Sequence, residues 1–229
     1  MDYILSGLWE AVRLIIQGDE QMWSAVTATL RVTTLSMTAS LLTGLPAGFA
    51  LGYFNFPGKP KIRLAVDTLL ALPTVFIGLV VYAFLTRKGP LGEFGLLFTL
   101  PGIAIGQTIL ALPIVVSLSA TAVEAMDRHL RPALISLGAG RVQLVLTSLW
   151  EVRFGIIAAA LTAYGRVMTE VGISMMVGGN IKWYTRTITT AIALETGKGM
   201  FATGIALGVI LILIAFIVNS SLSFLRKVK

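Results

Sequence analysis

Long uncharged stretches alternate with short polar ones along this chain. No Asp, Glu, Lys or Arg occurs at positions 32–58, 68–86, 94–123 and 199–225, and a further apolar block at 154–181 contains only Arg166 and Glu170. A helix needs about 20 mainly apolar residues to cross the hydrocarbon core of a membrane, whereas barrel strands are shorter. The pattern therefore predicts an all-α, polytopic membrane protein with five transmembrane helices, at about 30–54, 66–86, 100–123, 154–177 and 200–224.

The first segment, residues 1–21, is too short and too charged to cross. It does not resemble a secretory signal peptide, because no basic residue precedes Arg13. On a helical wheel its apolar positions fall within about 140°, and they are Ile4, Leu5, Leu8, Trp9, Val12, Ile15 and Ile16. Its polar positions lie opposite, at Ser6, Glu10, Arg13 and Gln17. We expect an extracytoplasmic amphipathic helix that lies in the membrane interface or packs on the bundle.

The composition supports a membrane protein. Apolar residues make up 56% of the chain and charged residues only 13%, against roughly 45–50% and about 25% in a soluble domain. This excludes a soluble enzyme, a disordered tail and a fibrous protein. The absence of cysteine from the sequence excludes disulfides and thiolate chemistry. The net charge is +7, and the basic residues lie in gaps between the apolar blocks. We therefore expect them to direct membrane topology, and we expect no nucleic-acid partner.

The distribution of basic residues between the loops predicts the orientation. One side of a five-span chain would hold ten of them: Lys59, Lys61, Arg63, Arg128, Arg131, Arg141, Arg153, Arg226, Lys227 and Lys229. The other side would hold six: Arg13, Arg87, Lys88, Lys182, Arg186 and Lys198. The prediction is an N-terminus outside and a C-terminus inside, with a cytoplasmic loop at 124–153 and a basic cytoplasmic tail at 226–229.

Glycines and prolines interrupt the predicted spans. Gly44, Gly48 and Gly52 lie four residues apart and share one helix face, which lets another helix approach closely. This face serves packing within the chain or a dimer seam, and we expect the former. Prolines also lie inside spans and permit kinks, at Pro46, Pro73 and Pro113.

Polar groups inside the spans are the candidates for a translocation route. Arg166 and Glu170 are four residues apart and can pair, and Thr162 and Thr169 share their helix face. Ionisable residues in a membrane face the bundle interior or an aqueous cavity. The pair is therefore either a structural ion pair or part of the route lining.

The segment 178–200 joins the last two predicted spans and combines cations with hydroxyl groups. Its basic residues are Lys182, Arg186 and Lys198, and its hydroxyl donors are Thr185, Thr187, Thr189 and Thr190. Positive potential raises the local concentration of an anion without tight capture. We expect this segment to form part of an anion entrance; the alternative is a set of solvated or partner-docking residues.

No catalytic constellation is evident in the sequence. His129 is the single histidine and lies in a loop, which argues against a metal site or a catalytic triad. Gly197-Lys198-Gly199 lacks the spacing and the hydroxyl of a phosphate-binding P-loop. We therefore expect a transport subunit without cofactor or metal, and not an enzyme. If transport is driven by ATP, another chain must hydrolyse it.

The 124–153 loop is unusually apolar for a cytoplasmic connection. Its apolar residues are Leu134, Leu137, Val142, Leu144, Val145, Leu146, Leu149 and Trp150. Gly138 and Gly140 interrupt them, which favours helix–turn–helix over one continuous helix. So much apolar surface needs a protein partner or a groove to cover it.

The stretch Pro132-Ala133-Leu134-Ile135-Ser136-Leu137-Gly138-Ala139 resembles the EAA loop of binding-protein-dependent ABC importer permeases. Ala133, Leu137, Gly138 and Ala139 match best, whereas Pro132 stands where the family has Glu. Trp150-Glu151 likewise stands where it has Leu-Pro. In that family the loop forms a coupling helix that docks into a groove of the ATPase. The resemblance implies this role for Ala133, Leu137, Gly138 and Ala139, together with Gly140 and Arg141.

The second half of the chain carries a longer resemblance. It looks like the permease subunit of tungstate importers, which are relatives of the molybdate and sulfate permeases. The matching stretches are Glu151-Val152-Arg153-Phe154-Gly155-Ile156, Gly165-Arg166-Val167, Glu170-Val171-Gly172, Met175-Met176-Val177-Gly178-Gly179-Asn180-Ile181, Tyr184-Thr185-Arg186 and Thr189-Thr190-Ala191-Ile192-Ala193-Leu194-Glu195-Thr196.

This resemblance implies the type I ABC importer permease fold, in the inner membrane of a prokaryote. The expected partners are a second copy of the chain, a cytoplasmic ABC ATPase dimer, an extracytoplasmic oxyanion-binding protein and membrane lipid. Tungstate is the expected cargo. A molybdate or sulfate permease of the same family remains an alternative, as does an ion-coupled transporter or channel that uses Arg166 and Glu170 as its polar core.

Overall fold

The computed structural model describes residues 2–127 and 129–227, and these residues form helices and no strand. Arg128 and the side chains of the basic tail (Arg226, Lys227 and Lys229) lie outside the described part. The longer helices are α1 (Asp2–Gln17), α2 (Glu20–Tyr53), α3 (Lys59–Leu69), α4 (Thr74–Leu85), α5 (Leu100–Glu124), α7 (Arg141–Glu151), α8 (Arg153–Met168), α10 (Ile188–Gly197) and α11 (Phe201–Lys227). The shorter ones are α6 (Leu130–Ser136), α9 (Gly172–Gly178) and the 3₁₀ turn η1 (Gly92–Phe94).

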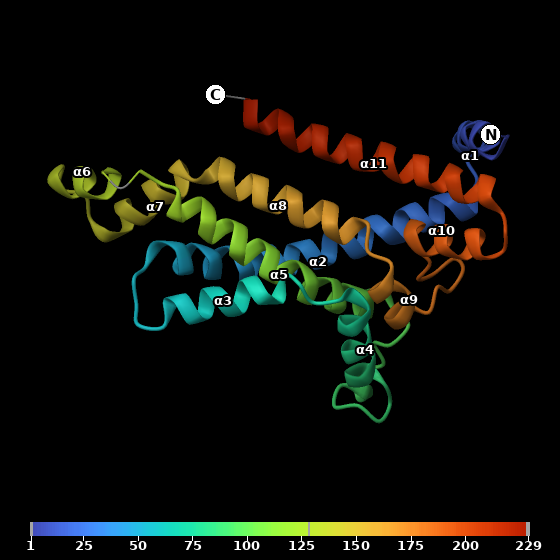
Figure 1. Cartoon of the computed structure of the whole chain (residues 1–229), viewed down its shortest axis with the longest axis horizontal. Helices are drawn as coiled ribbons and strands as arrows, with labels where there is room; N and C mark the ends of the chain where they lie inside the picture. Colours follow the sequence, from blue (N-terminus) through green and yellow to red (C-terminus); the bar gives the residue numbers. More distant parts are fainter. Residues whose placement is uncertain (1, 128, 228–229) are drawn as a thin grey trace.

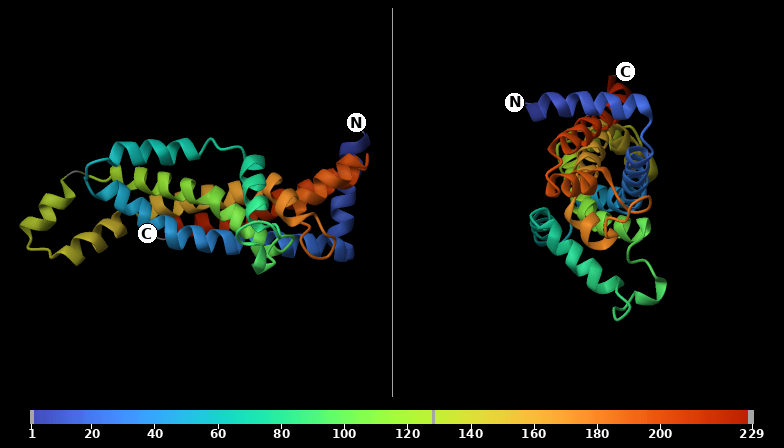
Figure 2. Two further views of the ribbon diagram at one scale, coloured as in Figure 1. Left: turned by 90° about the horizontal axis from the view of Figure 1, so that it is seen from below. Right: turned by 90° about the vertical axis from the view of Figure 1, so that its right-hand side faces the viewer.

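Four long helices form an elongated bundle. Helices α2, α5, α8 and α11 run along its long axis (Figure 1). Helices α6 and α7 lie at one end, and α1 and α10 lie at the other (Figures 1 and 2). Helix α4 projects sideways from the bundle beside α9 (Figure 1). The two ends of the molecule are therefore built from different parts of the sequence.

The glycine face of α2 packs against α5. A Cβ atom added at Gly48 would lie 2.7 Å from the carbonyl oxygen of Val116, and one at Gly52 would lie 2.7 Å from that of Ala120. At Gly44 the nearest atom would be a Val115 methyl carbon at 3.0 Å. The expectation that this face serves packing within the chain is thus confirmed, because the missing side chains let two backbones meet.

The predicted span at 66–86 is a bent pair of helices, and the bend lies at Pro73, where the sequence permits a kink. Helix α3 ends at Leu69 and α4 begins at Thr74, and their axes differ by 95°. Pro73 stands at the start of α4 in extended conformation, and a proline both lacks the N–H that would continue the helix and disfavours helical geometry in the residue before it. A strong bend at this proline is the result. Arg63 and Asp67 tie α3 to α5, through bonds of 2.6 Å to Thr121 and 2.7 Å to Ser117.

The segment predicted to form the span at 154–177 is divided between two helices. Helix α8 ends at Met168 and α9 begins at Gly172, with a break at 169–171. Helix α8 joins α7 at an angle of 56°. Among the described residues, three helices are long and apolar enough to cross a membrane, or five if each bent pair counts as one span. The expected spans at 100–123 and 200–224 correspond to α5 and α11, whereas α2 begins at Glu20, well before position 30.

The N-terminal segment packs on the bundle, which is one of the two expected alternatives. Helix α1 lies across the end of the bundle (Figure 2) and packs on α11. The contact is made by small residues: Ala11 is buried, and a Cβ atom at Gly7 would lie 2.6 Å from a methyl carbon of Ile205. The wide apolar face, which includes Leu5, Trp9 and Ile16, remains exposed.

Candidate functional site

The 124–153 segment folds as the expected helix–turn–helix. Helix α6 ends at Ser136, and Gly138 adopts a left-handed conformation with φ of 80°. Its N–H donates to the carbonyl of Ile135, and that of Ala139 donates to the carbonyl of Leu134. This pair of bonds is the usual way in which a glycine closes a helix C-terminus. Gly140 then precedes α7, and its N–H donates to the side chain of Gln143. Gly138 therefore sets the angle between the two helices.

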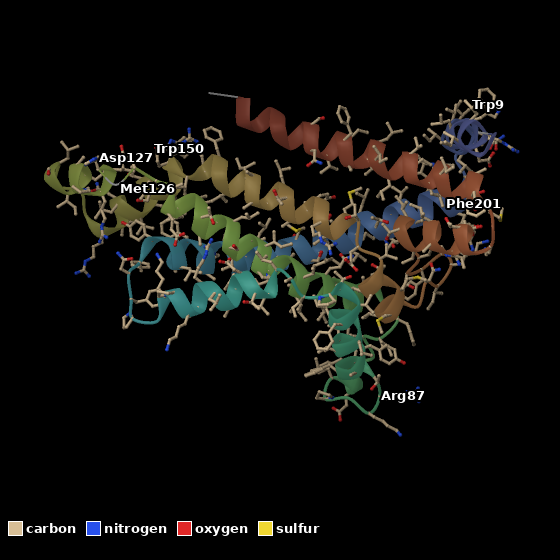
Figure 3. The ribbon with its side chains drawn as sticks, viewed as in Figure 1. Trp9, Arg87, Met126, Asp127, Trp150 and Phe201 are labelled. Carbon is tan, nitrogen blue, oxygen red and sulfur yellow. The ribbon has the colours of Figure 1, made fainter. Side chains whose placement is uncertain are left out.

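The turn and one face of α7 present apolar side chains to the outside. Leu137 at the tip is 83% exposed. Val142, Leu146 and Trp150 are exposed at four-residue spacing along α7, and Trp150 lies at the same end as Met126 and Asp127 (Figure 3). The other face of α7 is covered, since Leu144 and Ser148 are buried. A continuous apolar stripe of this kind fits an external groove better than water.

The segment is fixed to the bundle at its base. The Arg131 guanidinium lies 5.4 Å from the centre of the Tyr53 ring, at the end of α2. Lys59 pairs with Glu124 at 3.3 Å, which joins the start of α3 to the end of α5. The start of α6 therefore contacts the end of α2, and the beginning of the segment contacts the start of α3.

Arg166 and Glu170 form an ion pair at the break between α8 and α9. Their Nη1 and Oε2 atoms lie 3.0 Å apart. The Arg166 side chain is 44% exposed, whereas that of Glu170 is only 2% exposed. Thr162 and Thr169 are exposed beside Arg166, and their hydroxyls donate to carbonyl oxygens of their own helix. Glu170 itself therefore cannot line a route in this conformation.

The other Glu170 carboxylate oxygen, Oε1, accepts the N–H of Ile173 at 3.2 Å and so caps α9. Its backbone carbonyl accepts the hydroxyl of Thr189 at 2.9 Å. The break between α8 and α9 is thus held by hydrogen bonds to Glu170, which explains why the predicted helix does not continue.

A row of buried, hydrogen-bonded polar side chains lies beside Glu170 and was not predicted from the sequence. The Ser174 hydroxyl donates to the Glu170 carbonyl at 3.3 Å and accepts from Gln107 at 3.4 Å. Gln107 in turn accepts the hydroxyl of Ser36 at 3.3 Å. The row links α2, α5 and α9. Gln107 lies within an uncharged apolar block, and this isolated amide was the available signal.

Lys182 and Arg186 line a cavity of about 410 Å³ between α2, α10 and α11. This basic cavity is also lined by Lys198, Asp19 and Glu195. Lys198 pairs with Glu195 at 2.9 Å, and Asp19 caps α2 by accepting the N–H of Met22 at 2.7 Å.

The charges of Lys182 and Arg186 are less compensated. Arg186 Nε donates to Asn180 at 3.2 Å, and Lys182 lies 5.0 Å from the centre of the Trp183 ring. Among the described residues, these two cations of the cavity lining have no ion-pair partner, whereas Lys198 pairs with Glu195. Arg166 and Glu170 do not line it, so the candidate route residues fall in two separate places.

The expectation that four threonines offer hydroxyl donors to an anion is wrong. Thr185, Thr187, Thr189 and Thr190 are all buried. Thr185 donates to the carbonyl of Gly178, Thr189 to that of Glu170 and Thr190 to that of Thr187, while the Thr187 hydroxyl accepts the N–H of Thr190 at the start of α10. These hydroxyls form hydrogen bonds to backbone groups where the chain turns, so they do not face an anion in the cavity.

No three His, Asp or Glu side chains in the described part of the chain lie close enough together to hold a metal ion.

No family model matches the chain. It is 50% identical over 219 residues to the tungstate uptake system permease protein TupB of Campylobacter jejuni, an alignment that covers 96% of this chain and 92% of that protein. It is 31% identical over 227 residues to TupB of Peptoclostridium acidaminophilum, covering 99% of this chain and all of the relative. The molybdenum transport system permease protein ModB of Escherichia coli K12 is 30% identical over 177 residues, which is 74% of this chain and 77% of ModB.

Among solved structures, a chain of the MetNI methionine ABC transporter in an inward-facing conformation superposes with a TM-score of 0.76 at 21% identity, over 91% of this chain and 96% of that chain. This likeness shows the fold. The apolar helices, the exposed helix–turn–helix and the close relatives agree: the chain belongs to the family of ABC importer permeases that includes the tungstate and molybdenum uptake permeases.

Proposed function

We propose that the chain is the membrane permease of an ATP-driven tungstate importer. The observation that carries this proposal is the 50% identity to a tungstate uptake permease over 92% of its length. The chain is a transport subunit and not itself an enzyme. Its work is to offer the anion a route and to couple that route to ATP hydrolysis on a partner.

Two copies of the chain form the pore. The described part of one chain provides five spans at most, and an odd number cannot supply two equal halves around a central route. A symmetric dimer supplies them, and two-fold dimers are the commonest soluble oligomers. The half-exposed Arg166 and the exposed Thr162 and Thr169 offer a polar surface on α8 that fits such a route better than lipid.

The 124–153 segment is the contact to a cytoplasmic ATPase dimer. The exposed stripe of Leu137, Val142, Leu146 and Trp150 supplies an apolar surface for a groove. The ties from Arg131 to Tyr53 and from Glu124 to Lys59 carry its displacement into the bundle. ATP binding closes the ATPase dimer, draws the two segments together and opens the route outward; hydrolysis reverses the movement.

An extracytoplasmic binding protein delivers the anion at the opposite end, with the N-terminus outside and the C-terminus inside. The basic cavity lies there, and Lys182 and Arg186 give it the positive potential that attracts an oxyanion. Helix α1 lies in the outer interface, with its exposed apolar face in lipid.

Reconstitution tests this function. The permease, its ATPase and its binding protein are placed in proteoliposomes, and accumulation of tungstate, molybdate and sulfate is measured with and without ATP. We expect ATP-dependent accumulation of tungstate that requires all three proteins. Preferred accumulation of molybdate or sulfate would reassign the cargo. Flux without the ATPase, driven by an ion gradient, would show a secondary transporter or channel.

A further inference from the structure

The two members of the Arg166–Glu170 pair occupy different environments. The Glu170 carboxylate is buried and held by two contacts, with Arg166 Nη1 at 3.0 Å and with the N–H of Ile173 at 3.2 Å. The Arg166 side chain is 44% exposed on the surface of α8. Glu170 is therefore the buried and restrained member of the pair, and Arg166 is the exposed member.

Glu170 is fixed by several helices. Its carbonyl oxygen accepts hydroxyls from Thr189, in the first turn of α10, and from Ser174 on α9. Ser174 is bonded through Gln107 to Ser36, so α5 and α2 also define its position. A carboxylate restrained in this way orients the guanidinium that pairs with it.

Arg166 retains free hydrogen-bonding capacity. A guanidinium has five N–H donors in a planar fork, and the Arg166 fork has one hydrogen bond, to Glu170, among the described residues. The remaining donors lie on an exposed surface next to the side chains of Thr162 and Thr169. Arginine is well suited to tetrahedral oxyanions, because its fork can bond two oxygens at once.

We propose that Arg166 contacts the oxyanion as it crosses the permease and that Glu170 is the positioning residue that keeps this contact weak. The proposal rests on the proposed function, since it assigns the cargo a contact within the route. A cation without a counter-ion in the membrane would hold a dianion too long for release, and conduction requires binding that is weak enough to leave. The buried Glu170 offsets part of the Arg166 charge and fixes its direction.

The test measures tungstate binding to the detergent-solubilised permease by equilibrium dialysis, without the binding protein, and the transport rate of the reconstituted complex. Glu170→Gln keeps the side-chain size and an acceptor for Ile173 but removes the charge. We expect it to bind tungstate about fivefold more tightly than the wild type and to lower the maximal transport rate. Arg166→Gln should abolish detectable binding. If the pair is purely structural, each of the two substitutions would lower both tungstate binding and the transport rate, because less of the protein would fold.

Asp67→Asn is the matched control, because Arg63 and Asp67 have the same order, the same four-residue spacing and a similar distance of 3.2 Å. We expect it to leave tungstate binding unchanged. If Glu170→Gln does not fold, the double variant Arg166→Gln/Glu170→Gln decides, since it removes both charges together and should not bind tungstate.

Unchanged or weaker binding by folded Glu170→Gln, or binding retained by the double variant, would overturn the proposal. These outcomes are separate from a failure of the proposed function, in which the wild-type complex itself would not accumulate tungstate with ATP.

Discussion

Glycine and hydroxyl side chains determine how closely single residues of neighbouring helices approach. Gly48 and Gly52 let the α2 backbone meet that of α5, and the Thr29 hydroxyl on α2 accepts the N–H of Ile188 at 2.9 Å. Lipid provides no hydrophobic driving force between apolar helices, so close packing and hydrogen bonds must hold them together. Small residues therefore contribute more here than their size suggests.

Gly48→Ala should destabilise the protein. The new Cβ atom would lie 2.7 Å from the Val116 carbonyl oxygen and 3.1 Å from its Cα atom, and a backbone cannot move aside as a side chain can. Overpacking of this kind costs about 1–3 kcal/mol and should lower the melting temperature by several degrees. Gly208→Ala is the control, since no atom lies within 4 Å of its new Cβ. Equal melting temperatures for both variants would contradict the packing argument.

Breaks and turns decide where the individual elements end and which side chains they expose. Pro73 bends the chain by 95° between α3 and α4, and Glu170 holds the break between α8 and α9. The left-handed Gly138 places Leu137 at the tip of the 124–153 segment. Each element ends where a local group satisfies or removes a backbone hydrogen bond.

Gly138→Asp should separate the permease from its ATPase. The substitution strains the left-handed turn and puts a charge beside the apolar tip, so the segment no longer fits a groove. We expect normal membrane insertion, loss of ATPase in co-purification and loss of uptake. Gly199→Asp is a matched control, because Gly199 has the same φ of 80° and open space around it but lies between α10 and α11. If as much ATPase co-purifies with Gly138→Asp as with the wild type, the 124–153 segment is not the ATPase contact.

The whole molecule has two chemically different ends. Helices α6 and α7 form one end and carry Trp150, while α1 and the start of α11 form the other and carry Trp9 and Phe201 (Figure 3). The basic cavity lies at this second end, between α2, α10 and α11. This difference fits the import that we propose, in which one end receives the anion and the other contacts the ATPase.

Single cysteines test the orientation of these ends. The chain has no cysteine of its own, so each introduced thiol is labelled without background. An impermeant reagent added to intact cells should label Lys182→Cys and spare Lys61→Cys and Gly140→Cys, all three of which are exposed positions. Permeabilised cells serve as the control and should show labelling at every position. Labelling of position 61 from outside the cell would show that the predicted orientation is wrong.

The sequence by itself determined the features that depend on neighbouring positions in the chain. Apolar run length indicates membrane helices, and the glycines at 138 and 140 indicate a helix–turn–helix, because helix formation and termination are local. The motif resemblance led to the permease family for the same reason, since it rests on contiguous residues.

Only the tertiary structure decided what each polar or small residue does. Arg166 and Glu170 look equivalent in sequence, yet one is half-exposed and the other is buried. The threonines at 185–190 are buried because they satisfy backbone groups at the α10 start and the preceding turn. Their environments are set by helices that meet them from distant parts of the chain, as Thr29 meets Ile188 and Ser36 meets Gln107. The local pattern of apolar and polar residues does not specify these long-range contacts, because they depend on how the helices pack in three dimensions.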